Sequence, residues 1–202
     1  MVTESPTGKN VLLLLLKDFS RRHTITSIAK ELRLSRVGVW KALKKLEKKQ
    51  YTAAEPIGSG KTSASVITMN WENILVEKSL SLYLAEEALA QRRWRVNFAE
   101  AGAESGFLVL YGSILYSPQQ ANDIDLVGVA GKSKFISIQK TLDRAQKTLH
   151  KKIHAIHFTE AELEQELRKP NEAFVAAVKK GVVLFGQENF VRFMKKVHAH
   201  GQ

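Results

Sequence analysis

The sequence predicts an α+β protein with two domains joined by a helix. Apolar residues recur at helical spacing in the first 49 residues, and two β-prone segments follow them. Further along, short apolar runs typical of strands alternate with helical patterns. The 202 residues are enough for two small cores. We expect domains at residues 1–70 and 92–202, connected by a linker helix at 71–91.

The first domain is expected to hold three helices followed by two strands. Thr24 and Ser35 each precede a helical pattern, as helix N-caps do. The expected helices cover residues 10–19, Ile25–Leu32 and Arg36–Lys49. The expected strands are Tyr51–Ile57 and Ser63–Met69, on either side of the basic turn Gly58-Ser59-Gly60-Lys61.

Positive charge is concentrated in this first domain. The chain has a net charge of +11, and residues 1–70 contain 13 Lys or Arg against 5 Asp or Glu. A basic surface on one small domain is typical of proteins that bind nucleic acid. The plain alternative is a solvated lysine face without a partner.

The stretch LSRVGVWKALKKLEKKQY, residues 34–51, resembles the recognition helix of prokaryotic winged helix-turn-helix regulators, including the DNA-binding domain of biotin repressors. The resemblance implies that the third helix enters the major groove of double-stranded DNA by its N-terminal half. In that arrangement Arg36 is suited to a guanine edge. The DNA contacts implied by the resemblance are Ser35, Arg36, Gly38 and Lys41 facing the DNA, Lys44 and Lys45 near phosphate, and Lys61 at the adjacent backbone or minor groove.

Two points about this domain have alternatives. Trp40 is expected to pack under the wing because large aromatic side chains are mostly buried, and otherwise it faces DNA. A winged helix can also serve only for dimerisation or for contact with another protein. The excess of basic residues favours DNA.

The segment 71–91 is predicted to be a single amphipathic helix. Its residues Trp71, Leu75 and Leu82 form a stripe. This stripe either packs against the second domain or supports a homodimer.

The second domain is expected to alternate helices and strands. The predicted strands are Phe107–Tyr111, the run that contains Asp123, Ile153–Phe158 and Val182–Phe185. The predicted helices are Trp94–Ala101, Lys134–His150, a helix opened by a capping box at Thr159, Asn171–Lys180 and Glu188–Ala199.

The chemically informative motif of this domain is Gly112-Ser113 followed by Asp123-Ile124-Asp125. Two carboxylates two residues apart on a strand point to the same face, where they can bind divalent metal ions. A Gly-Ser turn at the end of a strand offers a close backbone approach and a hydroxyl to a phosphate. The alternative is a hairpin with a polar turn and two solvated aspartates.

This motif resembles the signature of the polymerase β-type nucleotidyltransferase superfamily, and in particular of its small stand-alone domains. The resemblance implies a mixed sheet flanked by helices, a nucleoside triphosphate, and Mg²⁺ or Mn²⁺ held by Asp123 and Asp125 as catalytic carboxylates. It assigns the phosphates to Gly112 and Ser113. The order of winged helix, linker helix and nucleotidyltransferase domain resembles a prokaryotic group of transcriptional regulators.

The chain departs from the superfamily pattern in two places. The strand that should carry a third carboxylate has none, and His154 aligns at that position. A neutral imidazole is a poor ligand for Mg²⁺. The basic residue common after the Gly-Ser turn is also missing, so Lys132 and Lys134 are the candidate cations for the triphosphate, with a solvated loop as the alternative.

The bulk composition excludes several other classes of protein. The chain has no cysteine, which excludes disulfides and thiolate metal sites and suits the cytoplasm. The apolar run at residues 11–16 is too short to cross a membrane, so no membrane association is expected.

Two hypotheses follow. The first and favoured one is a DNA-binding regulator whose second domain binds a nucleoside triphosphate with a metal, because the third carboxylate needed for catalysis is absent. The second is an active nucleotidyltransferase that modifies a protein, a nucleic acid or a small molecule. Small nucleotidyltransferases also occur in toxin–antitoxin pairs, which is a further setting for the second hypothesis.

Overall fold

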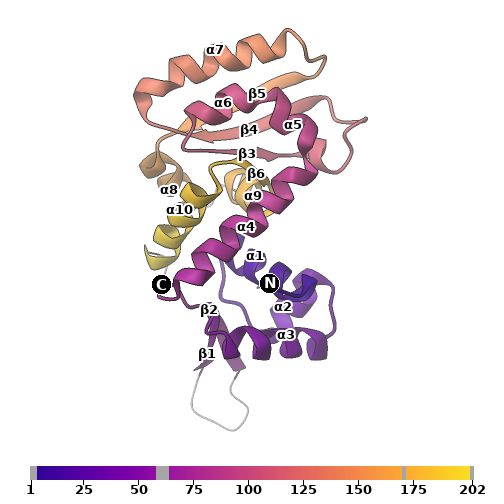
Figure 1. Cartoon of the computed structure of the whole chain (residues 1–202), viewed down its shortest axis with the longest axis vertical. Helices are drawn as coiled ribbons and strands as arrows, with labels where there is room; N and C mark the ends of the chain where they lie inside the picture. The colour runs from indigo at the N-terminus through magenta and orange to yellow at the C-terminus, as the bar shows by residue number, and fades with distance from the viewer. Residues whose placement is uncertain (1–3, 58–63, 170–171, 201–202) are drawn as a thin grey trace. The chain divides into compact units, whose positions relative to one another are not determined.

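The computed structural model describes residues 4–57, 64–169 and 172–200, and it confirms a mixed α+β chain (Figure 1). The described residues divide into two units. Unit 1 contains the chain up to Tyr83 together with the segment from Met194, and unit 2 runs from Leu84 to Phe193. The end of the last helix therefore belongs with the beginning of the chain.

Unit 1 begins with three helices, and a hydroxyl side chain caps each of them. They are α1 (Pro6–Lys17), α2 (Ile25–Leu32) and α3 (Arg36–Lys48). Helix α1 starts four residues before the predicted position because Ser5 caps it and Pro6, whose φ suits a helix start, takes the first position. Thr24 and Ser35 cap the other two helices as predicted.

Two antiparallel strands follow the helices, β1 (Thr52–Ile57) and β2 (Ala64–Met69). Together with the three helices they give unit 1 the element order of a winged helix-turn-helix. The predicted basic turn between the strands, including Lys61, lies outside the described residues. The backbone N–H of Ile67 donates a hydrogen bond of 2.7 Å to the carbonyl of His23, which attaches the wing to the segment before α2.

The core of unit 1 is built from the inward faces of these helices. Five aliphatic side chains of these helices are almost fully excluded from solvent, and burying each one stabilises the fold by roughly 1.5–3 kcal/mol. They are Leu12, Leu16, Ile28, Leu43 and Leu46.

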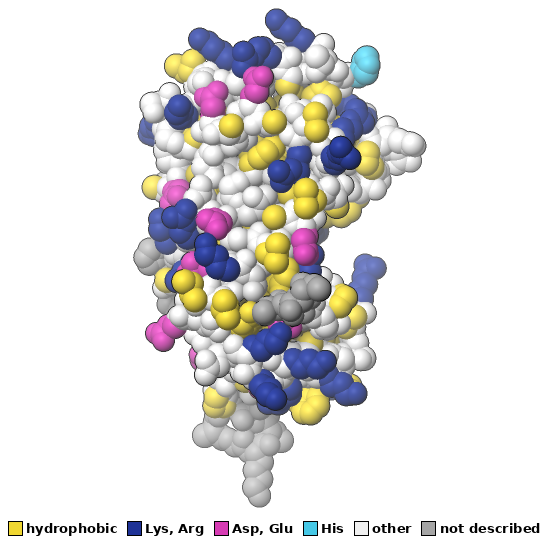
Figure 2. Space-filling view, viewed as in Figure 1, with side chains coloured by type: hydrophobic (Ala, Val, Ile, Leu, Met, Phe, Trp, Pro, Cys, Tyr) yellow, Lys and Arg dark blue, Asp and Glu magenta, His cyan; other side chains and the backbone are white. Residues whose placement is uncertain are grey.

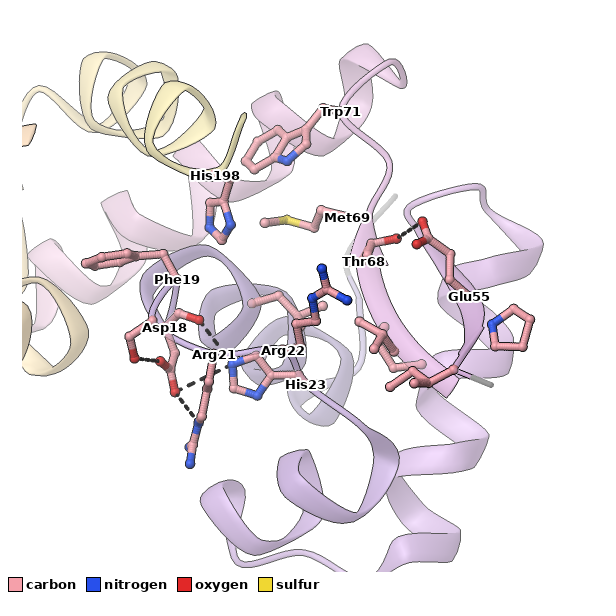
Figure 3. Close-up of a pocket in the computed structure, with 16 residues that line it drawn as sticks. Asp18, Phe19, Arg21, Arg22, His23, Glu55, Thr68, Met69, Trp71 and His198 are labelled. Atoms are coloured by element: carbon pink, nitrogen blue, oxygen red, sulfur yellow. Dashed lines mark hydrogen bonds and ion pairs between the residues drawn. The ribbon is translucent and has the colours of Figure 1, made fainter. Parts of the chain in front are cut away.

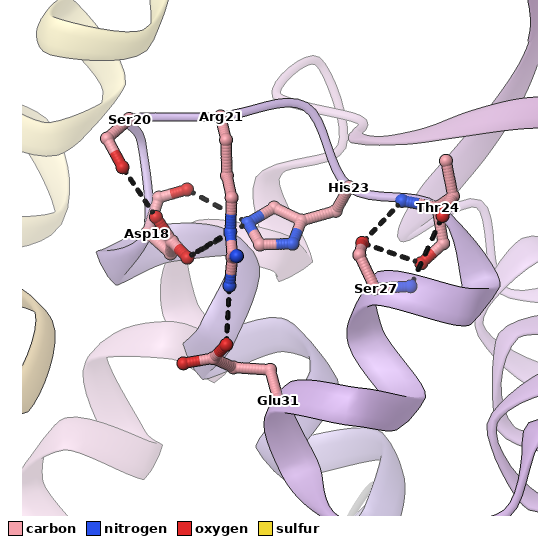
Figure 4. Close-up of polar contacts among 7 residues, drawn as sticks. All are labelled: Asp18, Ser20, Arg21, His23, Thr24, Ser27 and Glu31. Atoms are coloured by element: carbon pink, nitrogen blue, oxygen red, sulfur yellow. Dashed lines mark hydrogen bonds and ion pairs between the residues drawn. The ribbon is translucent and has the colours of Figure 1, made fainter.

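A buried carboxylate organises the segment between α1 and α2 (Figure 4). Asp18 is only 2% exposed and accepts hydrogen bonds from Ser20 Oγ and Arg21 Nε, each at 3.0 Å. Arg21 extends from there to Glu31 on α2. His23 Nε2 lies 3.1 Å from the Asp18 backbone carbonyl. The segment is thus fixed at several points, and it carries the carbonyl that anchors the wing.

Helix α4 (Ile74–Ala90) follows the wing and is shorter at both ends than predicted. It begins after Asn73, whose side chain accepts the Leu75 N–H at 3.0 Å. Leu80 is buried, whereas Leu75 and Leu82 are 51% and 50% exposed. Packing within the chain therefore leaves much of the predicted stripe open to solvent.

Unit 2 is built on a four-stranded mixed sheet of order β5-β4-β3-β6. Strand β3 pairs antiparallel with both β4 and β6, and β4 pairs parallel with β5. The strands are β3 (Phe107–Tyr111), β4 (Asp123–Val129), β5 (Lys152–Phe158) and β6 (Val182–Phe185).

Helices lie against this sheet and complete unit 2, and the last of them continues into unit 1 from Met194. The core includes Trp94, Phe98, Ile138 and Leu142 from the helices before β3 and after β4, packed with alternate residues of the strands. The helices are α5 (Arg92–Asn97), α6 (Ala99–Glu104), α7 (Phe135–Gln146), α8 (Glu160–Arg168), α9 (Glu172–Lys180) and α10 (Gln187–His200), with 3₁₀ turns at Ser113–Leu115 and Lys132–Lys134.

Two predicted helices of unit 2 differ from the observed ones. The helix predicted at Trp94–Ala101 is divided into α5 and α6 at Phe98, whose buried ring stacks on Trp94 at 6.2 Å. Helix α7 ends at Gln146 rather than at His150. The amide of Gln146 donates to two later carbonyls and its oxygen accepts the Ile153 N–H at 2.8 Å, so this side chain ends the helix and starts β5.

A pair of glycine variants tests one backbone constraint of unit 2. Gly186 has a φ of +74°, and a Cβ there would collide with the Gly106 carbonyl. We expect Gly186→Ala to lower the free energy of unfolding by about 1–3 kcal/mol. Gly131 has a φ of −67°, and a Cβ there would make only an ordinary contact of 4.0 Å with Ser133 Oγ. Gly131→Ala should be neutral or slightly stabilising, and equal urea midpoints for the two variants would contradict this account.

Candidate functional site

The outward face of α3 combines basic and apolar side chains. The helix buries one side in unit 1 through Val39, Leu43 and Leu46. Its other side is exposed to solvent along its whole length. Figure 2, viewed as Figure 1, shows a group of Lys and Arg side chains over this helix. The exposed residues of the helix are Arg36, Val37, Trp40, Lys41, Lys44, Lys45 and Lys48.

The residues predicted to contact DNA differ in whether their side chains are already paired within the protein. Arg36, Lys41 and Lys45 are exposed, and their side chains form no hydrogen bond or ion pair with any part of the chain that the structure describes. Lys44 is held by Glu47 at 2.7 Å. A DNA phosphate would have to compete with Glu47 for Lys44, whereas Lys45 is available at once.

Ser35 and Gly38 have a structural role in addition to their predicted one. The Ser35 hydroxyl accepts the Gly38 N–H at 3.0 Å and so caps α3. A Cβ at Gly38 would lie 3.1 Å from that hydroxyl, which is a tight contact. These two residues therefore set where the helix starts, and the predicted contact at Lys61 lies outside the described residues.

From the sequence we expected Trp40 to pack under the wing, but in the structure its side chain is exposed. Its side chain is 49% exposed, and the neighbouring Val37 is 62% exposed. The reason is its position on the helix, because the buried side of α3 is already occupied by the residues that face the core.

The second candidate site lies on the sheet of unit 2, where three metal-ligating side chains meet. Asp123 and Asp125 point to the same face of β4, and the parallel register places His154 of β5 directly beside Asp125. His154 Nδ1 lies 3.4 Å from Asp123 Oδ2 and 3.8 Å from Asp125 Oδ1. One ligand atom from each of the three residues falls within 4.8 Å of the others. His154, which aligns with the missing third carboxylate in the sequence, thus lies beside both aspartates in the structure.

The electrostatics of this cluster favour a cation. Burial, followed by the charge of Asp123, raises the pKa of the Asp125 carboxyl above its ordinary value, and His154 partly offsets this. Burial also raises the pKa of Tyr111, with both aspartates contributing. Two carboxylates this close repel each other when ionised, and a bound cation would relieve that repulsion.

Gly112 allows the turn after β3 to approach the cluster closely. Its φ is +82°, and a Cβ at this position would collide with the Asp125 carboxylate. Ser113 then starts a short 3₁₀ turn and is exposed. The Gly-Ser turn and the two aspartates, separated by ten residues in sequence, are therefore neighbours in the structure.

The two lysines predicted to bind a triphosphate are not near this cluster. Strand β4 has seven residues, which corresponds to a length of about 20 Å. The aspartates lie at its start, whereas Lys132 and Lys134 follow its end. Lys132 forms an ion pair of 3.1 Å with Glu162 on α8.

Sequence reasoning missed a closer cation. Lys152 pairs with Asp123 in the register of β4 and β5 and shares the exposed face of β5 with His154. The alternation of Lys152 and His154 along the strand was the signal that could have revealed it.

The donor set of the cluster fits a divalent metal, with a preference among metals. Two carboxylates and one imidazole suit Mn²⁺ and later transition metals, whereas Mg²⁺ prefers oxygen ligands alone. Among the expected ions, the residues present therefore fit Mn²⁺ better than Mg²⁺.

A separate pocket of about 520 Å³ lies within unit 1, between the end of α1 and the wing (Figure 3). Arg22, Met69, Trp71 and His198 line it. His198 Nε2 lies 3.0 Å from the Leu16 carbonyl, and its ring is 6.0 Å from that of Trp71. Burial lowers the pKa of His198, which favours the neutral form of its ring.

Comparisons with known proteins do not place the chain in a family. No protein-family model matches it, and no curated protein matches it. Among solved structures it is similar to Lactococcus lactis ZitR, a zinc-responsive MarR family member. The identity to ZitR is 21%, and the match covers 48% of this chain and 62% of that one with a TM-score of 0.37.

Two structures of ZitR mutants match at a similar level. One has 21% identity, a TM-score of 0.37 and coverage of 48% of this chain and 64% of that one. The other has 16% identity, a TM-score of 0.38 and coverage of 73% and 77%. The chain spans less than two thirds of the length of the first two, and likeness at this level assigns neither a family nor a function. Within the described residues, no helix is long and apolar enough to cross a membrane.

The raised pKa of Asp125 makes a prediction about pH. A raised carboxyl pKa favours the folded state below the ordinary pKa, and this contribution is lost as pH rises through the raised value. We expect Asp125→Asn to stabilise the protein more at pH 7 than at pH 3, measured as the free energy of unfolding in urea. Asp143→Asn, at an exposed carboxylate of α7, is the matched control. A larger gain at pH 3 than at pH 7 would contradict the assignment.

Proposed function

We propose that the chain is a DNA-binding regulator of transcription that reads double-stranded DNA with α3. The observation that carries the proposal is the exposed face of α3, where four lysines, one arginine and two apolar residues cover a helix with a well-formed core side. The basic face complements the phosphate backbone, and the element order of unit 1 presents such a helix to DNA.

We propose in addition that two copies act together. Leu75 and Leu82 are two helical turns apart on α4 and both are half exposed. A second copy would cover them and would bring two α3 helices to a two-fold DNA site. Sedimentation of the full chain tests this, and a monomer at micromolar concentration would contradict it.

For unit 2 we propose that Asp123, Asp125 and His154 bind a divalent metal together with a nucleoside triphosphate. The support is the close approach of the three ligands and of the Gly-Ser turn. Lys152 is the better-placed cation for the phosphates than Lys132 or Lys134. A metal bound here would neutralise the carboxylates and the phosphates. The histidine at the third ligand position favours binding over nucleotidyl transfer.

The DNA part of the proposal predicts different salt dependences for two neighbouring lysines. Lys45→Ala should lower the slope of log K against log salt concentration by about 0.9, the value for one lost phosphate contact. Lys44→Ala should lower it less, because Glu47 already holds Lys44. Fluorescence anisotropy with a labelled duplex measures both. Lys140→Ala, the same charge change on exposed α7, is the control, and an equal effect from it would contradict a site on α3.

The metal part predicts a thermal shift. Each of the four nucleoside triphosphates at about 100 times its Kd with Mn²⁺ should add roughly 2.7 kcal/mol of stability, about 5–10 °C for a chain of this size. We expect a smaller shift with Mg²⁺, and none with Asp123→Asn. If Mn²⁺ alone raises the unfolding temperature and no nucleotide raises it further, metal binding is supported and nucleotide binding is contradicted. No shift with any combination would remove both.

A further inference from the structure

The outward face of α3 is divided into two parts along the helix. Its first two turns carry the apolar side chains Val37 and Trp40 together with Arg36 and Lys41, and the exposed residues of its later turns are Lys44, Lys45 and Lys48. Val37 is the second residue of the helix, and Lys44 and Lys48 follow it on the same line at seven and eleven residues. The exposed apolar groups are therefore confined to the first part of this surface, where they lie among basic groups, and the later part is basic.

Single exposed apolar residues are common on protein surfaces and need no explanation. Here two of them lie next to each other, one turn apart, on a face that is otherwise basic. They are 62% and 49% exposed, and one of them is a tryptophan. Two of the residues beside Val37 at the start of the helix are small, since Ser35 is the cap and Gly38 has no side chain, and the third is the exposed Arg36. A flat surface such as the floor of the major groove can approach this end of the helix.

The two parts of the face match two different parts of a DNA duplex. Lysines contact phosphates, which hold the protein in place without reading sequence. Apolar side chains in the major groove contact the C5-methyl group of thymine, which is the apolar feature of a base edge. The N-terminal half of a recognition helix is the half that reaches the bases.

We infer that Val37 and Trp40 read thymine methyl groups, so that the preferred DNA carries thymines opposite the first two turns of α3. This inference rests on the proposed DNA binding and names its sequence preference. It adds base-reading residues to the contacts implied by the resemblance. Among those contacts Arg36 and Lys41 are suited to a guanine edge, whereas Ser35 and Gly38 form the cap of α3.

The test removes the methyl groups without changing anything else in the DNA. Duplexes that bind the full chain are first selected from a random-sequence pool. Each thymine of a selected duplex is then replaced by uracil, which lacks only the methyl group. We expect a loss of affinity of about fourfold for each contacted methyl group, at one or a few adjacent positions.

The variants assign the lost contacts to residues. Val37→Ala and Trp40→Ala should bind the thymine duplex more weakly and should each lose sensitivity to uracil at their own position. Both side chains are exposed, so neither change removes core packing. Ile136→Ala, at an exposed apolar residue of α7, is the matched control and should keep the affinity and the uracil pattern of the unchanged protein.

Two outcomes would overturn the inference, and they are distinguishable. Binding of selected DNA with no loss at any uracil position would refute methyl reading and leave the proposed DNA binding intact. Failure to enrich or bind any duplex at low salt would refute both. In that case the apolar pair would be assigned to a protein partner.

Discussion

The burial of Asp18 is the constraint on which unit 1 depends. A carboxylate that is removed from water has to be paired, because an unpaired buried charge is costly. Asp18 meets this requirement with Ser20 and Arg21, and Arg21 continues to Glu31 on α2. The short segment that supplies these partners also contains His23, whose carbonyl receives the N–H of Ile67 in the wing. The contacts of one buried carboxylate thus link the segment before α2 both to α2 and to the wing. Because α3 follows α2 directly, these contacts also help to set the direction in which α3 faces.

The site of unit 2 depends on a comparable local constraint. Gly112 passes so close to Asp125 that any side chain there would collide with the carboxylate. The parallel pairing of β4 and β5 then brings His154 to the other side of the aspartates. The cluster is therefore assembled by the paired backbones of β4 and β5, which carry the ligands, and by the glycine turn that follows β3. This explains how two carboxylates remain side by side despite the raised pKa of one of them.

Features encoded locally were predicted well from the sequence. The caps Thr24, Ser35 and Thr159 mark helix starts because the signal and its effect lie within four residues. The end of α7 at Gln146 was not predictable. Nothing in the sequence pattern shows that this side chain will hydrogen-bond to the N–H of Ile153 in the next strand. The exposure of Trp40 depends on which side of α3 the core fills. The place of Lys132 was misjudged because closeness in sequence was taken for closeness in space, across a strand about 20 Å long. The contact between His198 and Leu16, 182 residues apart, has no sequence signal at all.

The position of β5 at the end of the described sheet has a consequence for the behaviour of the metal cluster. The two aspartates lie on β4, which is paired on both sides, whereas the histidine lies on a strand that is paired on one side only. Edge strands open more readily than central ones, and their amides exchange with solvent sooner. An ion held by all three residues would link β5 to β4. Binding of the ion would therefore slow the hydrogen exchange of the β5 backbone amides. The order of one edge strand of the described sheet would then depend on what the site contains.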